Sequence, residues 1–370
     1  MKDQNISLRQ MMTLLFIAII ALGAEVVPGI AGAGAAAWLA PLLALIPVLL
    51  LLYLAFRKPE EERRKDLGEE FSVALGKWGG KLFSLIFLLW ALFLLVVNTA
   101  RCARRLTVAE GTPVFFSSIV LLLAVWMAAK KLPAFVRTCE IFYLAMGIGL
   151  LAIALLAGLR LRPDYIFLFT GEELANVPQV AASLLGVVSI GLYALFVSGS
   201  ITVRKKDAAR CYRWTIALFL TFSILLLLIL GTFGAPLVGI MQRPFFQMVA
   251  GLGLTGAFQR LEALLSSLWM LGDIALLGLL LFAVKRLTAC IAGKKDSVWV
   301  VIVAGLLAFL GGEVLAGQEG LLQLSQQTIL PQGSLIAGAL LTLLFFIIKI
   351  VKEVKKKGAV KQENKKEFKK

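Results

Sequence analysis

Histidine is absent from this 370-residue sequence, and cysteine is scarce. Histidine is the side chain that most often binds metals and moves protons near neutral pH, so its absence removes histidine-based metal sites and catalytic triads. The cysteines lie too far apart for a metal-ligand pattern or a disulfide framework; they are Cys102, Cys139, Cys211 and Cys290. Phosphate-binding glycine loops and nucleophile motifs are also missing. We therefore expect no enzyme activity, no metal site and no cofactor.

Polar segments long enough to form a soluble domain are missing as well. The chain is 60% hydrophobic with a mean hydropathy of +0.90, more than a soluble core can bury. Its apolar runs of about 20 residues suit helices that cross a hydrocarbon layer of about 30 Å, and they lack the alternation of outer-membrane strands. The sequence therefore predicts an all-α polytopic membrane protein with about ten transmembrane helices. The predicted spans are residues 10–34, 38–56, 82–100, 114–129, 135–157, 181–203, 212–235, 258–284, 297–316 and 334–351.

Acidic residues are outnumbered by basic ones, which gives a net charge of +16. If the N-terminus is cytoplasmic, the lysines and most arginines fall on the cytoplasmic side, as the positive-inside rule requires. The exceptions are all arginines: Arg101, Arg104, Arg105, Arg160, Arg162, Arg243 and Arg260. The excess charge therefore indicates an integral membrane protein with both termini in the cytoplasm, its partner being the lipid bilayer and not nucleic acid.

The ten spans divide into two groups of five, so the second group enters the membrane with the opposite orientation. This is the arrangement of a 5+5 inverted repeat, in which the first helix of each half is often discontinuous. We predict one transmembrane domain over residues 1–351, with halves at about 8–157 and 181–351. Residues 352–370 are predicted to form a basic cytoplasmic tail.

The stretch LGAEVVPGIAGAGA, residues 22–35, interrupts the first span with a carboxylate and a helix breaker. Pro28 removes the hydrogen bond to the carbonyl of Ala24 and would leave unpaired backbone from Gly23 onward. Lipid does not tolerate such backbone, nor the charge of Glu25, so both must face protein or water.

Two alternatives remain open for Glu25. Either the freed backbone and Glu25 line a small-molecule site, or the helix has a simple kink whose glutamate pairs with an arginine or stays protonated. In the first case Glu25 would also be a candidate for proton or ion coupling.

The eighth span carries one polar and aromatic stripe. At 100° per residue, four side chains share a face; they are Glu262, Ser266, Trp269 and Asp273. The stripe is typical either of a vestibule that ends near the membrane centre or of a helix interface joined by hydrogen bonds. Asp273 is the deeper acid and the second candidate for proton or ion coupling.

Two further spans contribute candidate residues. In the third span, Asn98, Arg101 and Arg105 share a face that could receive a carboxylate, pair with an acid of another span, or meet lipid phosphate. In the sixth span, the segment GLYALFVSGS adds Gly191, Tyr193 and Ser198 to the predicted substrate-binding residues.

Several segments resemble one known family. ISLRQMMTLLF near the start, LGKWGGKLFSLIFLLW before and within the third span, GTP before the fourth and QRLEALLSSLWMLGD in the eighth are similar to the B subunits of spore germinant receptors. That family belongs to the amino acid–polyamine–organocation transporter superfamily. The resemblance runs over nearly the whole chain and implies a LeuT-like fold with discontinuous helices 1 and 6 around an amino-acid-sized site.

The resemblance also implies a function, a location and partners. It predicts a nutrient-sensing subunit in the spore inner membrane, with a small nutrient, an amino acid, as ligand. An A-type membrane subunit and a C-type lipoprotein would be its partners. Two alternatives remain: a proton-coupled secondary transporter of amino acids or amines, and a structural scaffold with a degenerate site.

Overall fold

The computed structural model describes residues 5–25, 29–56, 65–106, 113–202, 207–241, 243–252 and 261–352. Within these residues, eight helices are long and apolar enough to cross a membrane, and two shorter apolar helices, Leu8–Gly23 and Val114–Ala129, accompany them. Together they account for the ten spans that the sequence predicts. The all-α polytopic class is confirmed.

The first half of the chain contains the spans predicted as one to five. Its elements are β1 (Ile6–Ser7), α1 (Leu8–Gly23), α2 (Ile30–Ala33), the 3-10 segment η2 (Gly34–Leu39), α3 (Ala40–Phe56), α4 (Leu67–Leu106), α5 (Pro113–Ala129) and α6 (Leu132–Gly158). α4 is bent at Gly76, whose φ of 78° lies in the left-handed region that favours glycine.

The second half begins with the short helix α7 and contains the spans predicted as six to ten. Its elements are α7 (Asp164–Phe167), α8 (Gly171–Val188), the 3-10 segment η3 (Ser189–Ser200), β2 (Ile201–Thr202), α9 (Asp207–Phe233), α10 (Ala235–Ile240), α11 (Pro244–Gly251), α12 (Leu261–Ala292), α13 (Val298–Ala316), α14 (Glu319–Leu324), the π-helical segment η4 (Ser325–Ile329), α15 (Leu330–Ser334) and the π-helical segment η5 (Leu335–Leu340). Helical structure continues from η5 to Lys352.

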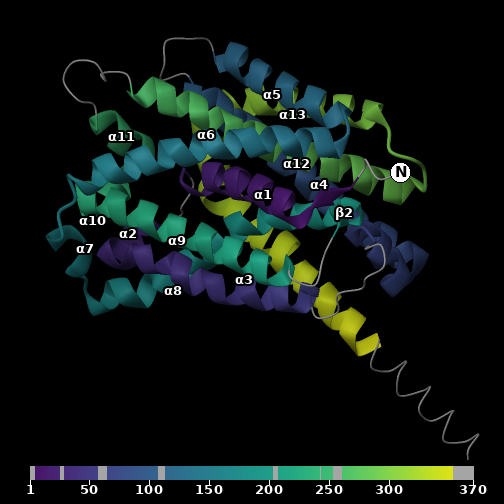
Figure 1. The fold of residues 1–370 in the computed structure, drawn as a ribbon, viewed down its shortest axis with the longest axis horizontal. Helices are drawn as coiled ribbons and strands as arrows, with labels where there is room; N and C mark the ends of the chain where they lie inside the picture. The colour runs from purple at the N-terminus through teal and green to yellow at the C-terminus, as the bar shows by residue number, and fades with distance from the viewer. Residues whose placement is uncertain are drawn as a thin grey trace, which may run out of the picture.

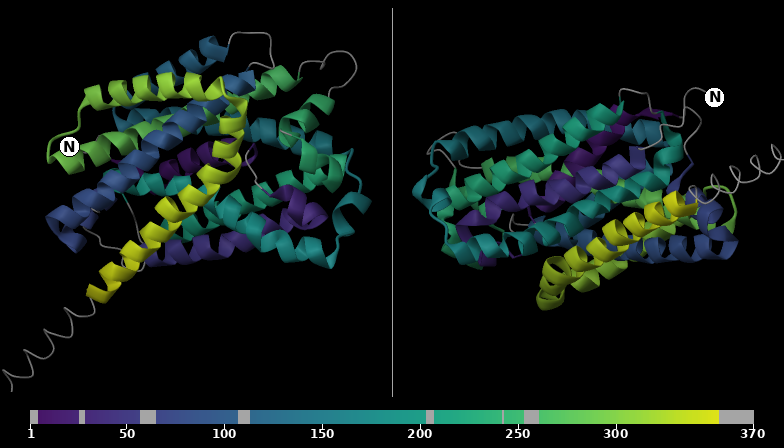
Figure 2. Two further views of the ribbon diagram at one scale, coloured as in Figure 1. Left: turned by 180° about the vertical axis from the view of Figure 1, so that it is seen from behind. Right: turned by 90° about the horizontal axis from the view of Figure 1, so that it is seen from below.

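Helix α1 lies in the interior of the bundle (Figure 1), packed against α12, α6 and α9. Most of its side chains from Ile17 to Leu22 are fully buried, although the helix is only 16 residues long. The last span, drawn in yellow, runs obliquely along the outside of the bundle in both views of Figure 2. Helix α1, in contrast, is largely covered by protein, and a helix so covered is suited to a role other than anchoring the chain in the membrane.

The sixth span begins earlier than the predicted residue 181, at Gly171. Thr170 caps the helix, since its backbone N–H donates to Glu173 at 2.8 Å and its hydroxyl accepts from the Glu173 N–H. Glu173 also accepts from the Ala35 N–H at 3.2 Å. Polar residues at the start of this span therefore hold the turn between the first two spans.

Gly34 in that turn has no room for a side chain. Its φ is 51°, and a Cβ would stand 1.7 Å from a carboxylate oxygen of Glu173. Asn176 adds a hydrogen bond to the Gly32 carbonyl at 2.9 Å. The turn and the start of α8 thus depend on each other.

The tenth span also begins earlier than predicted, at Glu319 instead of residue 334. Pro331 lies inside it, and a proline in a helix removes a backbone donor and crowds the preceding turn. The π-helical segments η4 and η5 flank this proline and accommodate the missing donor and the crowding, so the helix continues.

Helices 1 and 6 are both discontinuous, in different ways. The first span stops at Gly23 and resumes at Ile30, whereas the sixth changes from an α-helix to the 3-10 segment η3 at Ser189. β1 and β2 pair in parallel, with Ile6 opposite Ile201, so the start of the first span meets the end of the sixth. We call this end of the bundle the N-terminal face.

The segment before α4 fastens η3 at the N-terminal face. The Ser198 hydroxyl donates to the Lys65 carbonyl at 3.1 Å, and the Gly199 N–H donates to Asp66 at 2.6 Å. Arg286 of α12 lies 3.8 Å from Asp66 and donates to the Ser200 hydroxyl at 3.3 Å. Burial raises the pKa of Asp66 to about 6, although the Gly199 N–H and Arg286 act in the opposite direction.

Candidate functional site

The break in the first span provides the first part of the site. A capping box of Ser7 and Gln10 starts α1, and the helix ends at Gly23 with Ala24 as its C-cap. The Glu25 N–H donates to the Leu22 carbonyl at 3.2 Å, which tightens the last turn. Since α2 starts only at Ile30, the interruption predicted around Gly23 and Glu25 is present; Pro28 itself lies outside the described residues.

Arg101 of α4 holds this break to two other spans. Its side chain is only 1% exposed. Nη1 donates to the Glu25 carboxylate at 2.8 Å and to the Ala21 carbonyl at 3.2 Å, and Nη2 donates to the Asp273 carboxylate at 2.7 Å. Charge-assisted bonds of this length are among the strongest in proteins. One guanidinium therefore ties the end of α1 to α4 and α12.

Trp269 completes the contact with the end of α1. Its indole N–H donates to the Ala21 carbonyl at 3.0 Å, so this carbonyl is shared with Arg101. A helix end leaves carbonyls without intrahelical partners, and here side chains from α4 and α12 supply the donors for the Ala21 carbonyl. Phe245 and Phe246 of α11 pack against the indole ring, with centroid distances of 4.6 and 6.0 Å.

Asn98 lies one turn before Arg101 on α4. Its amide donates to the Leu94 carbonyl at 2.7 Å, which leaves its Oδ1 for another donor. Among the described residues, Asn98 Oδ1 and Arg101 Nε are buried without a hydrogen-bond partner. An acceptor and a donor, three residues apart on α4, are therefore left next to the ion pairs, where a polar ligand or water would be stabilised.

Close packing of small residues positions these groups. Gly272 of α12 lies against α1, where a Cβ would be 2.4 Å from the Ala21 Cβ and 3.0 Å from the Ile17 carbonyl oxygen. At Gly23 a Cβ would be 2.4 Å from ring atoms of Phe222 on α9. Only glycine lets the three helices approach so closely.

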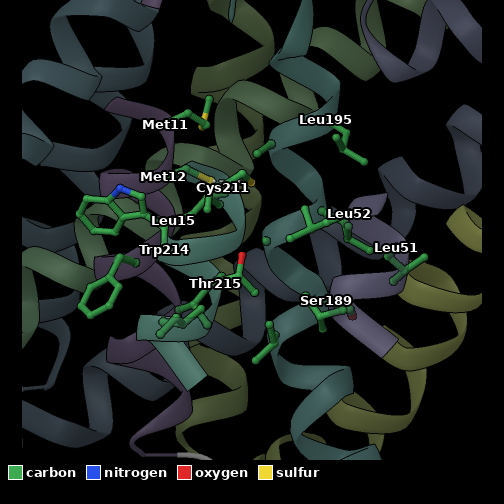
Figure 3. A pocket seen from close by; sticks show the side chains of 18 of the residues that line it. Met11, Met12, Leu15, Leu51, Leu52, Ser189, Leu195, Cys211, Trp214 and Thr215 are labelled. Atoms are coloured by element: carbon green, nitrogen blue, oxygen red, sulfur yellow. Dashed lines mark hydrogen bonds between the residues drawn. The ribbon is translucent and has the colours of Figure 1, made fainter. Parts of the chain in front are cut away.

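A separate apolar cavity of about 150 Å³ lies in the half of the bundle near the N-terminal face (Figure 3). It lies between α1, α3, η3, α9 and the last span. Of the sequence-predicted site residues, Gly191 and Ser198 line this cavity. The structure therefore divides the candidate residues into a charged group at the helix break and a small group beside an apolar cavity.

The structure shows which partners the charged residues have. Glu25 is in a buried ion pair with Arg101, and its side chain is 5% exposed. Arg101 of the third span pairs with acids of two other spans, whereas the side chain of Arg105 lies outside the described set. Trp269 and Asp273 of the eighth-span stripe take part, and Ala24, next to Glu25 in the sequence, is also buried. The side chains of Glu262 and Ser266 lie outside the described set.

Tyr193 belongs to neither group. It is buried in an aromatic cluster with Phe87 and Phe196, and its hydroxyl donates to the Phe87 carbonyl at 3.0 Å. The sequence pattern did not indicate the role of Phe245 and Phe246, which cover Trp269. It indicated Arg101 as a pairing candidate but did not place it at the centre of the site. The available signal was its spacing from Asn98, which puts both residues on one face of the third span.

Comparisons with known proteins agree with this architecture. The profile of the family Spore_permease, described as "Spore germination protein", matches residues 5–311. No curated protein sequence matches the chain.

Solved structures of transporters share the fold. The structure of MhsT in complex with L-phenylalanine aligns with a TM-score of 0.63 at 18% identity, covering 90% of this chain and 89% of MhsT. A mutant of the manganese transporter of Eremococcus coleocola aligns with a TM-score of 0.60 at 14% identity, covering 94% and 82% of the two chains. At these identities the likeness concerns the fold alone. It is the LeuT-like fold with its 5+5 inverted repeat.

Proposed function

The chain belongs to the spore germination protein family, and from this membership and the site at the helix break we propose that it is a nutrient-sensing subunit of a spore germinant receptor. The family and the fold are those of non-enzymatic transport and receptor proteins. The ligand that we propose is a free amino acid.

One observation supports the ligand class above all others: Arg101 is buried between two carboxylates at the end of α1. An amino acid zwitterion has the complementary pair of charges. Its carboxylate would bind the Arg101 guanidinium in the bidentate manner that arginine favours. Its ammonium group would be held by Glu25 and Asp273. Asn98 Oδ1 and Arg101 Nε are additional groups with which such a ligand could bond.

The replacement of internal bonds of Arg101 by bonds to the ligand would convert binding into a structural signal. Without ligand, Arg101 holds α1 against α4 and α12 through Glu25, Asp273 and the Ala21 carbonyl. A ligand that takes over part of these bonds favours conformations in which the end of α1 is released. The ligand can shift the equilibrium only by its difference in affinity for the two states. The broken first span, which ends at Gly23 and Ala24 instead of continuing as one helix, would be the moving element.

The proposal is tested by the thermal stability of the purified protein in the presence of each amino acid. A ligand at about 100 times its Kd adds about 2.7 kcal/mol to the free energy of unfolding, enough for a measurable rise in Tm. For the best amino acid, we expect the matching amino acid amide and the matching carboxylic acid without the amino group to give smaller rises. An equal rise with the amide would show that Arg101 does not recognise the ligand. No rise with any amino acid would favour a structural scaffold.

Secondary transport is the second candidate function, and the transporter fold favours it. In this case Glu25 or Asp273 would exchange a proton or ion during alternating access. Uptake of the stabilising amino acid by the protein in liposomes would support transport, and Glu25→Gln should abolish that uptake. Binding without uptake would favour sensing.

We further propose that the protein resides in the spore inner membrane with both termini in the cytoplasm. It would act there with an A-type membrane subunit and a C-type lipoprotein. Long apolar helices and family membership support a membrane location. Co-purification from spore membranes with an affinity tag on this chain tests the partners, and protease access to the tag in sealed vesicles tests the orientation.

A further inference from the structure

The apolar cavity near the N-terminal face extends along α1, as its lining residues show, and we call it the slot. Along α1, six lining residues lie on one face: Leu8, Met11, Met12, Leu15, Phe16 and Ile19. From Leu8 to Ile19 this face is about 16 Å long at 1.5 Å per residue. The α9 wall runs from Cys211 to Phe219, about 12 Å by the same rise. Figure 3 shows side chains from both walls pointing into the slot.

These dimensions match one leaflet of a bilayer. The hydrocarbon core is about 30 Å thick, so an acyl chain reaches about 15 Å along the membrane normal. The slot runs beside two spans and lies in the half of the bundle that contains the start of α1 and the end of η3. Its length and direction are therefore those of an acyl chain in the leaflet at the N-terminal face.

The chemistry of the lining also favours a hydrocarbon. Two of its three hydroxyl groups are engaged within the protein: the Ser189 hydroxyl lies 2.7 and 2.6 Å from the carbonyls of Gly186 and Ser334, and the Ser198 hydroxyl lies 2.7 and 3.1 Å from those of Leu195 and Lys65. Thr215 carries the third. Most of the remaining wall is leucine, methionine, isoleucine and aromatic residues. An engineered apolar cavity of about 150 Å³ stays dry and takes up apolar molecules. Methionines such as Met11 and Met12 adapt their shape to such an occupant.

The outer walls of the slot adjoin the lipid-facing surface. The segment η2, which leads into α3, is fastened to α9 away from the slot, where the Ser223 hydroxyl donates to the Trp38 carbonyl at 2.6 Å. The opposite ends of α3 and α9 line the slot, and next to those lining residues both helices expose large apolar side chains. These are Leu50 and Tyr53 on α3 and Ile216 and Leu220 on α9. A chain in the slot would therefore be continuous with the lipid around the protein.

We propose that this slot binds one acyl chain of a membrane lipid, which packs between the first half of the broken helix 1 and η3. The occupied slot braces α1, because the chain fills the space into which Met11, Leu15 and Ile19 would otherwise move. The site is distinct from the charged group at Arg101. Lipid composition would thus set how easily α1 moves when the charged site is occupied.

The test uses the full-length protein in nanodiscs that contain a phospholipid with a diazirine in the middle of one acyl chain. After illumination, peptide mapping should find adducts on slot residues, among them Met11, Met12 and Trp214. Thr215→Phe fills the slot, since Thr215 is a buried lining residue, and should remove these adducts. Ala217→Phe adds the same ring on the exposed side of α9 and should leave them.

The melting temperature of each variant identifies any that fail to fold, and Thr215→Leu then replaces Thr215→Phe as the smaller filling substitution. Adducts found only on outward-facing residues such as Ile216 and Leu220 would overturn the proposal. The same conclusion would follow if slot adducts persisted undiminished in a folded filling variant. A water-soluble apolar compound that displaces no lipid adduct yet protects Cys211 from a thiol reagent would show that the slot serves a different ligand.

Discussion

Arg101 shows how one buried residue can connect three spans. A guanidinium buried to 1% exposure is costly in an apolar environment unless its charge is compensated, and here Glu25 and Asp273 provide compensation from two other spans. Removing one member of such a buried set costs about 3–5 kcal/mol, because the remaining charge is left without compensation. We propose that the same dependence makes the set responsive to a ligand that supplies charges of its own.

Replacing Arg101 with lysine tests this role. A lysine keeps the charge, but its compact ammonium cannot bond to two carboxylates with the planar geometry of a guanidinium. We expect Arg101→Lys to lower the Tm and to abolish the rise in Tm caused by the best amino acid. Arg162→Lys, at an exposed arginine that donates to the Tyr165 hydroxyl, is the control and should change neither quantity. Undiminished ligand stabilisation in Arg101→Lys would exclude Arg101 from the binding site.

Asp66 gives a prediction about pH at the N-terminal face. Burial raises its pKa from 3.8 to about 6 in the folded protein. Between these values the folded chain keeps a proton that the unfolded chain has lost, so its contribution to the free energy of unfolding falls as pH rises through this window. Above about pH 6 this contribution to the free energy of unfolding is fully lost, and for a pKa shift of this size the loss is about 2–3 kcal/mol.

Asp66→Asn should remove this pH dependence. The amide oxygen can still accept from the Gly199 N–H, so the contact to η3 is kept. We expect the variant to gain stability over the wild type above about pH 6 and to differ little near pH 4. Melting curves across this range measure the effect, with Asp164→Asn at an exposed aspartate of α7 as the control. Identical pH profiles for the wild type and Asp66→Asn would contradict the assignment.

At the scale of elements, the discontinuity of the first span could be predicted and its surroundings could not. Glu25 and Pro28 inside an apolar run violate local rules, and such violations mark functional positions. The early start of α8 was missed because the polar residues Glu173 and Asn176 are satisfied by the turn at Gly32 and Ala35, a contact between distant parts of the chain. The pairing of Arg101 likewise depends on which helices become neighbours, which periodicity does not reveal.

Helix packing at the site depends on glycine, and two glycines form a matched test. In Gly272→Ala the new Cβ would meet the Ala21 Cβ and the backbone of α1, so we expect a loss of about 1–3 kcal/mol in stability. At Gly147 on α6 a new Cβ would meet no atom within 4 Å, so Gly147→Ala should be neutral or stabilise through better helix propensity. Chemical denaturation or Tm compares the two. Equal effects would mean that α1 and α12 can separate at little cost.

At the scale of the whole molecule, composition and span count were sufficient for the fold class. The ten spans and the inverted repeat agree with the transporter fold found by structural comparison. The sequence predicts a hollow at Glu25, and this stays a prediction: the structure shows that Glu25 is paired with Arg101. The apolar slot nearer the N-terminal face was not predicted. Patterns of apolar residues do not distinguish a packed interface from a lined cavity.

The proposed function of the whole molecule depends on one exchange, in which the ligand's charges replace the internal bonds of Arg101 and free the end of α1. The most direct measurement is an experimental structure of the protein with the amino acid that stabilises it most, compared with one determined without ligand. We predict the ligand carboxylate on Arg101, its ammonium group beside Glu25 or Asp273, and a displaced α1. A bound ligand elsewhere, with Arg101 still bonded to both Glu25 and Asp273, would contradict this mechanism.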